Sequence, residues 1–104
     1  MSNFYNLSEE ILIEMCDQID EQDVDSIFET DYSDGILNIT VFANNKQYVI
    51  NRHNANQKIW FSSPISGADY FSYDEVKKQW LSDKGNELKE KLYAELNSFD
   101  GFNI

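Results

Sequence analysis

The order of the predicted elements indicates an α+β fold in which two helices pack on one face of a single antiparallel sheet of about six strands. An amphipathic helix opens the chain, a run of short strand-like segments separated by turns follows, and a second amphipathic helix closes it. With 104 residues, of which 41% are hydrophobic and 14% aromatic, the chain has the size and composition of one globular domain. We therefore expect a single domain over residues 1–104, with the other sheet face open to solvent.

The first predicted helix is amphipathic and has an acidic outer side. It is expected to begin after a cap at Ser2 or Asn3 and to end near Gln22. On a helical wheel, one arc collects the apolar residues Phe4, Leu7, Ile11, Leu12, Met15 and Ile19. The opposite side collects a row of like charges with no base nearby in the sequence: Glu10, Glu14, Asp17 and Glu21. Ile13 on the acidic side and Gln18 on the apolar side depart from the pattern.

Six short segments are predicted as strands, several of them with the apolar–polar alternation of half-buried strands. They span residues 27–32, 36–42, 47–53, 58–62, 70–73 and 79–81, with turns between them and a loop at 63–67 around Pro64. Alternation predicts that Leu37, Ile39 and Val41 face the helices. The open face is then expected to carry Glu29, Asp31, Asn38, Thr40, Asn51, His53, Lys58, Trp60 and Ser62.

The closing helix is expected to begin after a cap at Ser82 or Asp83. Glu87 and Lys91, four residues apart, are expected to form a favourable pair on its wet side. Its apolar face consists of Leu88, Leu92, Leu96 and Phe99. Each helix therefore has one apolar side with which to cover the sheet.

The charge of the chain is concentrated in its first 45 residues. That stretch contains eleven carboxylates and no lysine or arginine, whereas the eight later acids are matched by all eight bases, so it carries the whole net charge of −11. A solvated helix side with an acidic bias is one interpretation, although an ordinary solvated face mixes both signs. The charge argues against binding nucleic acid and favours cations or a partner with a basic surface.

Trp60 is the second informative feature, because a tryptophan on the solvent side of a sheet exposes a large apolar area unless a partner covers it. Two alternatives stay open at this point. Trp60 stacks on its cross-strand neighbours, or the strand parity is reversed and the ring belongs to the core.

Cysteine content and hydropathy bear on the compartment. Cys16 is the only cysteine, so no intramolecular disulfide or cysteine metal cluster can form, and it is expected to be a small filler. No run approaches 18 apolar residues, and the N-terminus is acidic where a targeting segment would be basic. We therefore expect a soluble, cytoplasmic protein that binds no membrane and is a monomer in the absence of metal.

The sequence resembles the frataxin family along nearly its whole length. The resemblance is carried by Tyr-Val-Ile-Asn-Arg-His at residues 48–53 and by Asn-Gln-Lys-Ile-Trp-Phe-Ser-Ser-Pro-Ile-Ser-Gly at residues 56–67. The acidic first helix, the Gly-Ile-Leu-Asn-Ile strand at residues 35–39 and the closing helix add to it. The absence of a presequence is expected of the bacterial, CyaY-type branch.

The resemblance implies an α-β sandwich and an iron-binding regulator, or iron chaperone, of the cysteine desulfurase–scaffold complex in iron-sulfur cluster assembly. It implies weak, reversible binding of Fe²⁺ or Fe³⁺ on the first helix and first strand, here called the acidic ridge: Asp17, Asp20, Glu21, Asp23, Asp25, Glu29 and Asp31. Partner contacts map to Asn51, His53 and Trp60. The chain departs from the family at residues 68–70, Ala-Asp-Tyr, where many members are basic, and at Arg52, where a lysine is common. Partner contacts that rely on positive charge at 68–70 cannot be carried over.

Carboxylate oxygens are hard ligands that suit Ca²⁺, Mg²⁺, Mn²⁺ and oxidised iron without selecting among them. Because a helix and a strand edge cannot enclose an ion, we expect weak, multiple and partly hydrated sites. One alternative is an enzyme, a ferroxidase that oxidises Fe²⁺ on the acidic ridge, but the sequence lacks the Glu-x-x-His pair of di-iron bundles. Another is an acidic mimic that docks on a basic protein by electrostatics alone, which leaves Trp60 and the Ser-Pro-x-Ser-Gly run unexplained.

Overall fold

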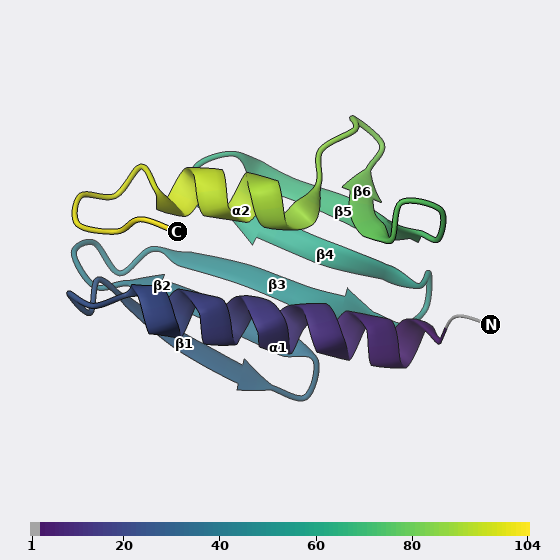
Figure 1. Cartoon of the computed structure of the whole chain (residues 1–104), viewed down its shortest axis with the longest axis horizontal. Helices are drawn as coiled ribbons and strands as arrows, with labels where there is room; N and C mark the ends of the chain where they lie inside the picture. Colours follow the sequence, from purple (N-terminus) through teal and green to yellow (C-terminus); the bar gives the residue numbers. More distant parts are fainter. Residues whose placement is uncertain (1–2) are drawn as a thin grey trace.

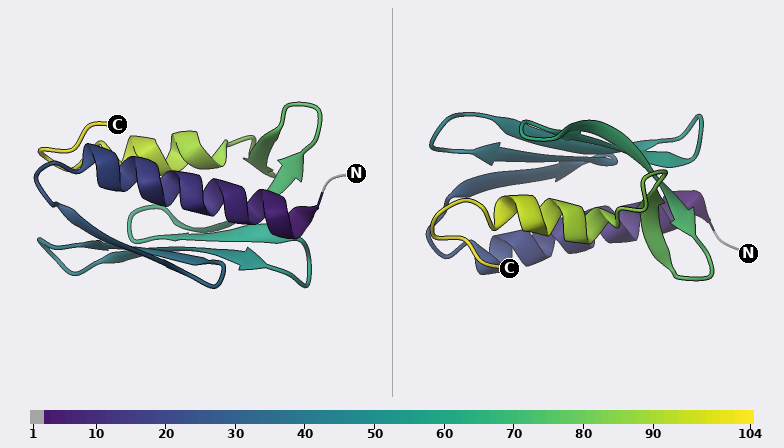
Figure 2. Two further views of the ribbon diagram at one scale, coloured as in Figure 1. Left: turned by 60° about the horizontal axis from the view of Figure 1, so that its bottom comes forward. Right: turned by 90° about the horizontal axis from the view of Figure 1, so that it is seen from above.

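The computed structural model describes residues 3–104 and has the predicted architecture, two helices on one face of a six-stranded antiparallel sheet (Figure 1). The elements are α1 (Phe4–Gln22), β1 (Phe28–Ser33), β2 (Ile36–Val41), β3 (Gln47–His53), β4 (Lys58–Ser63), β5 (Gly67–Asp74), β6 (Gln79–Ser82) and α2 (Leu88–Leu96). The strands lie in chain order from β1 to β6, and each pairs antiparallel with the next. Figure 2 shows both helices on the same side of the sheet, so only one sheet face is covered.

The core lies between the helices and the covered sheet face. Its fully buried members from the helices are Leu12, Met15, Ile19, Leu88, Leu92 and Leu96. From the sheet come Leu37, Ile39, Val41, Tyr48, Ile50, Ile59, Phe61 and Phe71. The predicted parity of the second strand is therefore confirmed. Trp80 of β6 is also buried, at 3% exposure, between the rings of Phe4 and Tyr73, whose centroids lie 6.0 and 5.3 Å from its own.

The first helix ends at Gln22 as predicted, and its cap is Asn3, whose side-chain oxygen accepts a hydrogen bond from the Asn6 amide. The alternative cap, Ser2, lies outside the described residues. Ile13 is exposed on the acidic side, as the periodicity predicts. Gln18 is tolerated on the apolar arc because its side-chain oxygen accepts a hydrogen bond from the Tyr93 hydroxyl of α2.

The predicted cap of the second helix is wrong. Ser82 belongs to β6, where its amide donates to the Asn86 carbonyl and its hydroxyl accepts from the Asn86 amide, so the chain turns before the helix begins. Glu87 is the cap instead, because its carboxylate accepts from the amides of Lys89 and Glu90. The expected Glu87–Lys91 pair is therefore absent from the ion pairs of residues 3–104.

The loop predicted at residues 63–67 is shorter in the structure. Ser63 and Gly67 face each other as the last pair of the β4–β5 ladder, so the connection consists of residues 64–66 alone. Strand β5 accordingly begins three residues earlier than expected. Neither helix is long and apolar enough to cross a membrane within the part of the chain that the structure describes.

Candidate functional site

The acidic ridge is formed where the second half of α1 lies over β1, the edge strand of the sheet (Figure 1). Six of its carboxylates are exposed, namely Asp17, Asp20, Glu21, Asp25, Glu29 and Asp31. Helical periodicity places the first three on the outer side of α1, and strand alternation places the last two on the open sheet face. No ridge carboxylate forms an ion pair with any of residues 3–104. The ridge is thus a surface of uncompensated negative charge.

Asp23 differs from the other ridge residues because its carboxylate accepts hydrogen bonds from backbone amides. Its two oxygens accept hydrogen bonds from the amides of Ile27 and Phe28, both at 2.8 Å. These bonds hold the turn from α1 into β1, where Ser26 has a positive φ of 53°. A metal ion at Asp23 has to compete with two backbone donors, so this residue is the poorest ligand of the predicted set.

Cys16 and Asp20 meet Thr30 at the contact between α1 and β1. The Thr30 hydroxyl donates to a carboxylate oxygen of Asp20, which ties helix to strand. Burial raises the pKa of the Cys16 thiol, and the charges of Asp20, Asp17 and Asp31 raise it further, against a hydrogen bond with Thr30 that lowers it. The thiol is therefore neutral near pH 7, a poor metal ligand at the margin of the acidic ridge.

On the open face, β1 and β2 bring ridge carboxylates opposite neutral oxygen ligands. Glu29 faces Thr40 and Asp31 faces Asn38 in the ladder. These four residues line part of a shallow depression of about 450 Å³. Within residues 3–104, no three histidine, cysteine or acidic side chains converge closely enough to enclose a metal ion. The geometry suits hydrated ions held by one or two carboxylates each.

The predicted partner residues lie together on the open face, and Trp60 has the expected parity. Its neighbours in β4, Ile59 and Phe61, are fully buried, whereas Trp60 is only half-buried. The ladder aligns Asn51 on β3, Trp60 on β4 and Tyr70 on β5 in one row across the sheet. The reversed-parity alternative for Trp60 is therefore wrong.

Tyr70 is the residue of this face that sequence reasoning missed. Its ring centroid lies 4.8 Å from that of Trp60 and 5.8 Å from that of His53, and the side chain is 37% exposed. Trp60 thus does pack on a cross-strand neighbour, with the two rings tilted by 59°, and the resulting aromatic pair remains accessible. The sequence contained one signal for this contact, which is the position of Tyr70 in the chain. If the β4–β5 connection is as short as the structure shows, Tyr70 lies opposite Trp60. His53 also contacts its own turn, with Nδ1 2.8 Å from Oδ1 of Asn56.

Arg52 follows the signature asparagine but points to the covered side of the sheet. Its side chain is only 5% exposed and lies against Tyr5 of α1. The charge at this position is therefore unavailable to a partner on the open face, which carries Asn51, His53, Trp60 and Tyr70 instead.

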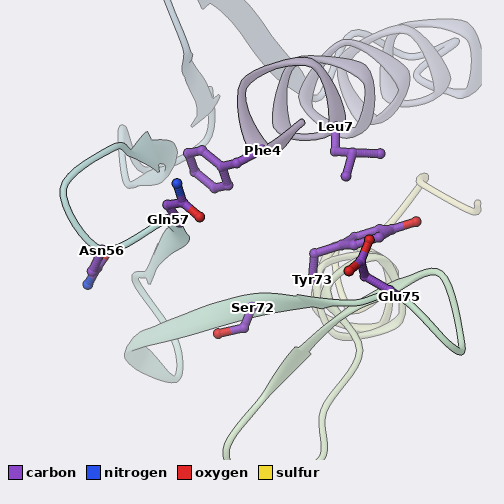
Figure 3. Close-up of a pocket in the computed structure, with 7 residues that line it drawn as sticks. All are labelled: Phe4, Leu7, Asn56, Gln57, Ser72, Tyr73 and Glu75. Atoms are coloured by element: carbon purple, nitrogen blue, oxygen red, sulfur yellow. The ribbon is translucent and has the colours of Figure 1, made fainter. Parts of the chain in front are cut away.

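A separate depression of about 380 Å³ lies between the first turns of α1 and strand β5 (Figure 3). It is lined by Phe4, Leu7, Asn56, Gln57, Ser72, Tyr73 and Glu75. Figure 3 shows Phe4 and Leu7 extending from α1 on one side and Ser72, Tyr73 and Glu75 on the other. With a single carboxylate among its lining residues, it offers no second place for the chemistry of the acidic ridge.

Two helices on one face of a six-stranded antiparallel sheet, an acidic first helix and an open aromatic sheet face together define an α-β sandwich of the frataxin type. The sequence model of the family described as "Frataxin-like domain" matches residues 1–100. This chain belongs to the frataxin family.

Three curated relatives are mitochondrial frataxins. The chain is 37% identical to that of Dictyostelium discoideum over 90 residues, which are 86% of this chain and 46% of the relative. It is 33% identical to that of Caenorhabditis elegans, covering 83% of this chain and 64% of the relative. It is also 33% identical to the Drosophila melanogaster homologue, covering 79% and 47%. The chain thus spans about half to two thirds of the length of these relatives.

Solved structures share the fold. A frataxin from Psychromonas ingrahamii, of the CyaY protein family, superimposes with a TM-score of 0.78 over 99% of this chain and 96% of that one. At 16% identity this likeness concerns the fold alone. A trimeric frataxin from Saccharomyces cerevisiae has a TM-score of 0.73 and 28% identity, covering 88% and 77%. A second yeast trimer, complexed with ferrous iron, has a TM-score of 0.71 and 26% identity, covering 94% and 86%.

Proposed function

We propose that this protein is an iron-binding regulator of iron-sulfur cluster assembly that acts on a cysteine desulfurase–scaffold complex in the cytoplasm. The acidic ridge binds the iron weakly and reversibly, and the open sheet face contacts the partner. The observation that carries the proposal is the separation of two surfaces. Ridge carboxylates that form no ion pair within residues 3–104 lie along one edge, and an accessible Trp60–Tyr70 ring contact lies on the adjoining face.

Charge and ligand type support iron on the ridge. Exposed carboxylates on the helix and on the edge strand repel their like-charged neighbours, so a hydrated cation held by one or two of them relieves that repulsion as well as gaining oxygen ligands. The yeast neighbour complexed with ferrous iron shows that a protein of this family holds Fe²⁺. Carboxylates alone select poorly among hard cations, so the binding is transient and competes with Mn²⁺ and Ca²⁺.

Exposure and register support partner binding on the sheet face. A half-buried tryptophan packed against a tyrosine ring presents a large, rigid apolar area that gains from desolvation, as the aromatic anchors of protein interfaces do. Asn51 in the same row adds hydrogen-bonding groups next to the rings. The negative ridge beside this face attracts a partner with a basic surface at long range, and the aromatic pair then makes the short-range contact.

An NMR titration tests the two roles separately. Fe²⁺, added without oxygen, is expected to broaden Asp17, Asp20, Glu21, Glu29 and Asp31, whereas the unlabelled desulfurase–scaffold complex is expected to broaden Asn51, Trp60 and Tyr70. Broadening by Fe²⁺ at His53 or in α2 with an unaffected ridge would contradict the metal role. The ferroxidase alternative would be favoured if the protein oxidised Fe²⁺ under air faster than the protein-free background. The acidic mimic would be favoured if Trp60→Ala left partner binding unaffected.

A further inference from the structure

Strand β1 forms one edge of the sheet, and its hairpin with β2 determines which of its backbone groups point outward. The two residues of the turn, Asp34 and Gly35, have positive φ angles of 49° and 79°. In a two-residue hairpin of this kind, the flanking residues form a hydrogen-bonded pair, which here is Ser33 with Ile36. Bonding alternates along an antiparallel ladder, so every second residue of β1 counted back from Ser33 bonds to β2. The backbone groups of the residues between them point away from β2.

The outward-pointing groups are therefore the amides and carbonyls of Thr30 and Tyr32. The Phe42 amide donates to the Ile27 carbonyl at 3.1 Å, which puts Ile27 among the residues bonded to β2, as this register requires. The hydroxyl groups of Thr30 and Tyr32 donate to carboxylates of α1. Outside the ladder, however, their amides donate to no backbone carbonyl of residues 3–104. Each of these two residues thus presents one free donor and one free acceptor along the edge.

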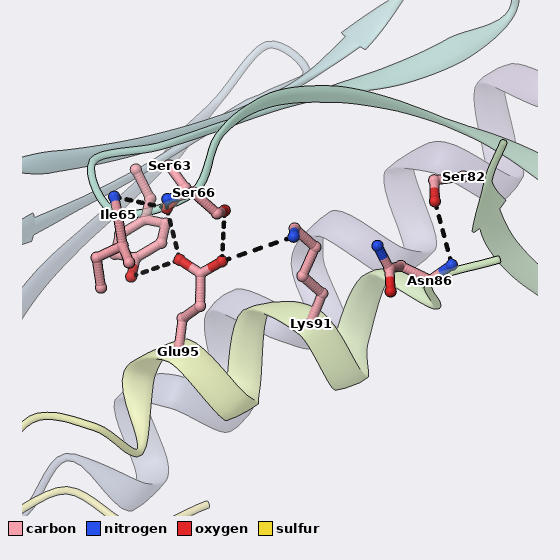
Figure 4. Close-up of polar contacts among 8 residues, drawn as sticks. Ser63, Ile65, Ser66, Ser82, Asn86, Lys91 and Glu95 are labelled. Carbon is pink, nitrogen blue, oxygen red and sulfur yellow. Dashed lines mark hydrogen bonds and ion pairs between the residues drawn. The ribbon is translucent and has the colours of Figure 1, made fainter. Parts of the chain in front are cut away.

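The opposite edge of the sheet is closed by the chain itself. Strand β6 has only four residues, and Leu81 within it forms a bridge with Glu87. Beside this bridge, the Ser82 amide donates to the Asn86 carbonyl at 2.9 Å, and the Ser82 hydroxyl accepts from the Asn86 amide at 3.1 Å (Figure 4). Strand β1 has six residues and lies at the outer margin of the sheet with no segment beyond it (Figure 1). It is the open edge.

The charges of β1 determine what can pair with this edge. Open edge strands commonly carry a lysine, a proline or a bulge that prevents pairing with another chain. Strand β1 contains none of these, since its sequence is Phe-Glu-Thr-Asp-Tyr-Ser and each residue has one partner in β2. It carries instead the exposed carboxylates of Glu29 and Asp31, two residues apart on the open face. Like charges opposite each other destabilise a strand pair, so the edge disfavours a second copy of this chain, whose net charge is −11, and favours a basic strand.

We propose that β1 binds an extended segment of a partner protein as an added antiparallel strand, with lysine or arginine at alternate positions opposite Glu29 and Asp31. Main-chain hydrogen bonds to Thr30 and Tyr32 hold the segment, and its alternating bases select it by charge. Water solvates these backbone groups in the free protein, but only an extended backbone matches their spacing along the strand. The pairing needs neither bound iron nor the Trp60–Tyr70 contact, so it goes beyond the proposed function and is independent of it.

Two isomeric peptides of equal charge test the strand pairing on the unmodified protein. The parent probe is a capped synthetic peptide of alternating threonine and lysine. With its lysines opposite Glu29 and Asp31, its threonine amides bond to β1 and its lysine amides point away. At saturation the parent peptide is expected to slow amide exchange of Thr30 and Tyr32 by about tenfold or more. Methylation of the threonine amides is expected to weaken binding by about tenfold or more, whereas methylation of the lysine amides leaves it nearly unchanged.

The outcome of this comparison is decisive in both directions. A threonine-methylated peptide that binds at least as tightly as its lysine-methylated isomer would overturn the proposal, because attraction by charge alone does not depend on which amides are methylated. Unchanged exchange of the Thr30 and Tyr32 amides at saturating peptide would overturn it as well. Trp60→Ala is expected to bind the peptide like the parent protein, so a failure of the proposed function would leave this result intact.

Variants of the protein test the role of the edge charges. Glu29→Lys/Asp31→Lys is expected to weaken binding of the parent peptide by about tenfold or more, because each base then meets a like charge. Glu75→Lys/Asp83→Lys makes the same charge change at exposed positions away from β1 and is expected to retain most of the affinity. Equal losses in the two variants would assign binding to the overall charge of the protein and overturn the edge site.

Discussion

The guanidinium carbon of Arg52 lies 3.9 Å from the centroid of the Tyr5 ring. This contact places a basic residue of β3 beneath the first turns of α1, with Nη1 3.8 Å from a carboxylate oxygen of Glu9. Nη1 has no hydrogen-bond partner among residues 3–104. The neighbouring Gly35 leaves the space for this side chain, because a Cβ there would lie 2.7 Å from Nη2 of Arg52. The arginine is therefore a structural contact between helix and sheet.

Arg52→Ala is expected to lower the free energy of unfolding by about 1–3 kcal/mol, because it empties the space under Tyr5 and leaves Glu9 without its cation. Arg52→Met fills the same space without an unpaired donor and is expected to cost less. Urea denaturation compares the two variants with the parent. Equal losses would mean that the charge, and not the packing, holds α1 at this point.

The two tryptophans give a matched pair for the role of the open sheet face. Trp60→Ala is expected to lower the free energy of unfolding by only about 1 kcal/mol, through loss of the ring contact with Tyr70, yet to weaken partner binding by about 2 kcal/mol or more. Trp80→Ala empties a core site and is expected to cost about 3–5 kcal/mol of stability. Thermal denaturation and binding assays on both variants test this contrast. A Trp60→Ala chain as unstable as Trp80→Ala would contradict it.

Asp23 is expected to behave as a structural residue rather than as a typical ridge carboxylate. Asp23→Ala leaves the amides of Ile27 and Phe28 without acceptors and is expected to destabilise the fold by about 1–3 kcal/mol. Glu21→Ala, close to it on α1, removes only like-charge repulsion and is expected to leave stability unchanged or slightly higher. Chemical denaturation distinguishes them. If both variants unfolded at the parent's midpoint, the Asp23 bonds would contribute nothing to stability.

Salt and divalent cations are expected to stabilise the protein, because screening weakens repulsion among the carboxylates of the acidic ridge, which form no ion pair within residues 3–104. Several small pair terms acting together amount to about 1–2 kcal/mol. Ca²⁺ should act almost as well as Fe²⁺, given the poor selectivity of carboxylates. Melting temperatures in NaCl and CaCl₂ series measure this stabilisation. An Asp17→Asn/Glu21→Gln variant serves as the control and is expected to respond less. A melting temperature independent of both salts would rule it out.

Stability is expected to fall at alkaline pH. Burial raises the pKa of Tyr48 above its usual 10.0, and the Glu95 carboxylate raises it further. Burial likewise raises the pKa of Tyr93, with added contributions from Glu14 and Glu87. A group whose pKa is higher in the folded state stabilises the fold fully below its unfolded pKa, and that contribution is lost as the pH rises through the folded value. The loss should therefore begin near pH 10.

Urea midpoints measured between about pH 8 and pH 11 follow the alkaline loss of stability through the usual pKa range of phenols. Tyr48→Phe cannot ionise and is expected to flatten the profile, while Tyr5→Phe, at an exposed position, serves as the control. A Tyr48→Phe profile as steep as that of the parent would assign the loss to other groups.

Much of the fold and part of the candidate site could be predicted from local patterns. Helical periodicity placed the end of α1 near Gln22 and Ile13 on its acidic side, and strand alternation placed Leu37 inward and Trp60 outward. These features depend on residues two to four positions apart, whose faces are dictated by the geometry of helix and strand. The unbalanced charge of the first 45 residues depends on composition alone, whereas the seven residues of the acidic ridge were assigned through the resemblance to the frataxin family.

The remaining features were decided by contacts between residues far apart in the chain. Lys89 of α2 pairs with Glu14, so one member of the acidic row does have a base nearby, and Tyr70 stacks on Trp60 only because β4 and β5 join through three residues. Arg52 is covered by Tyr5 of α1. Asp23 is the exception, because the amides of Ile27 and Phe28 that bind it lie only four and five residues further on, in a turn that helix and strand periodicity do not describe. Periodicity predicts which face of a helix or strand a side chain occupies. Only the packing of the helices on the sheet determines which residues the side chain contacts, because those contacts depend on distances that the local pattern does not contain.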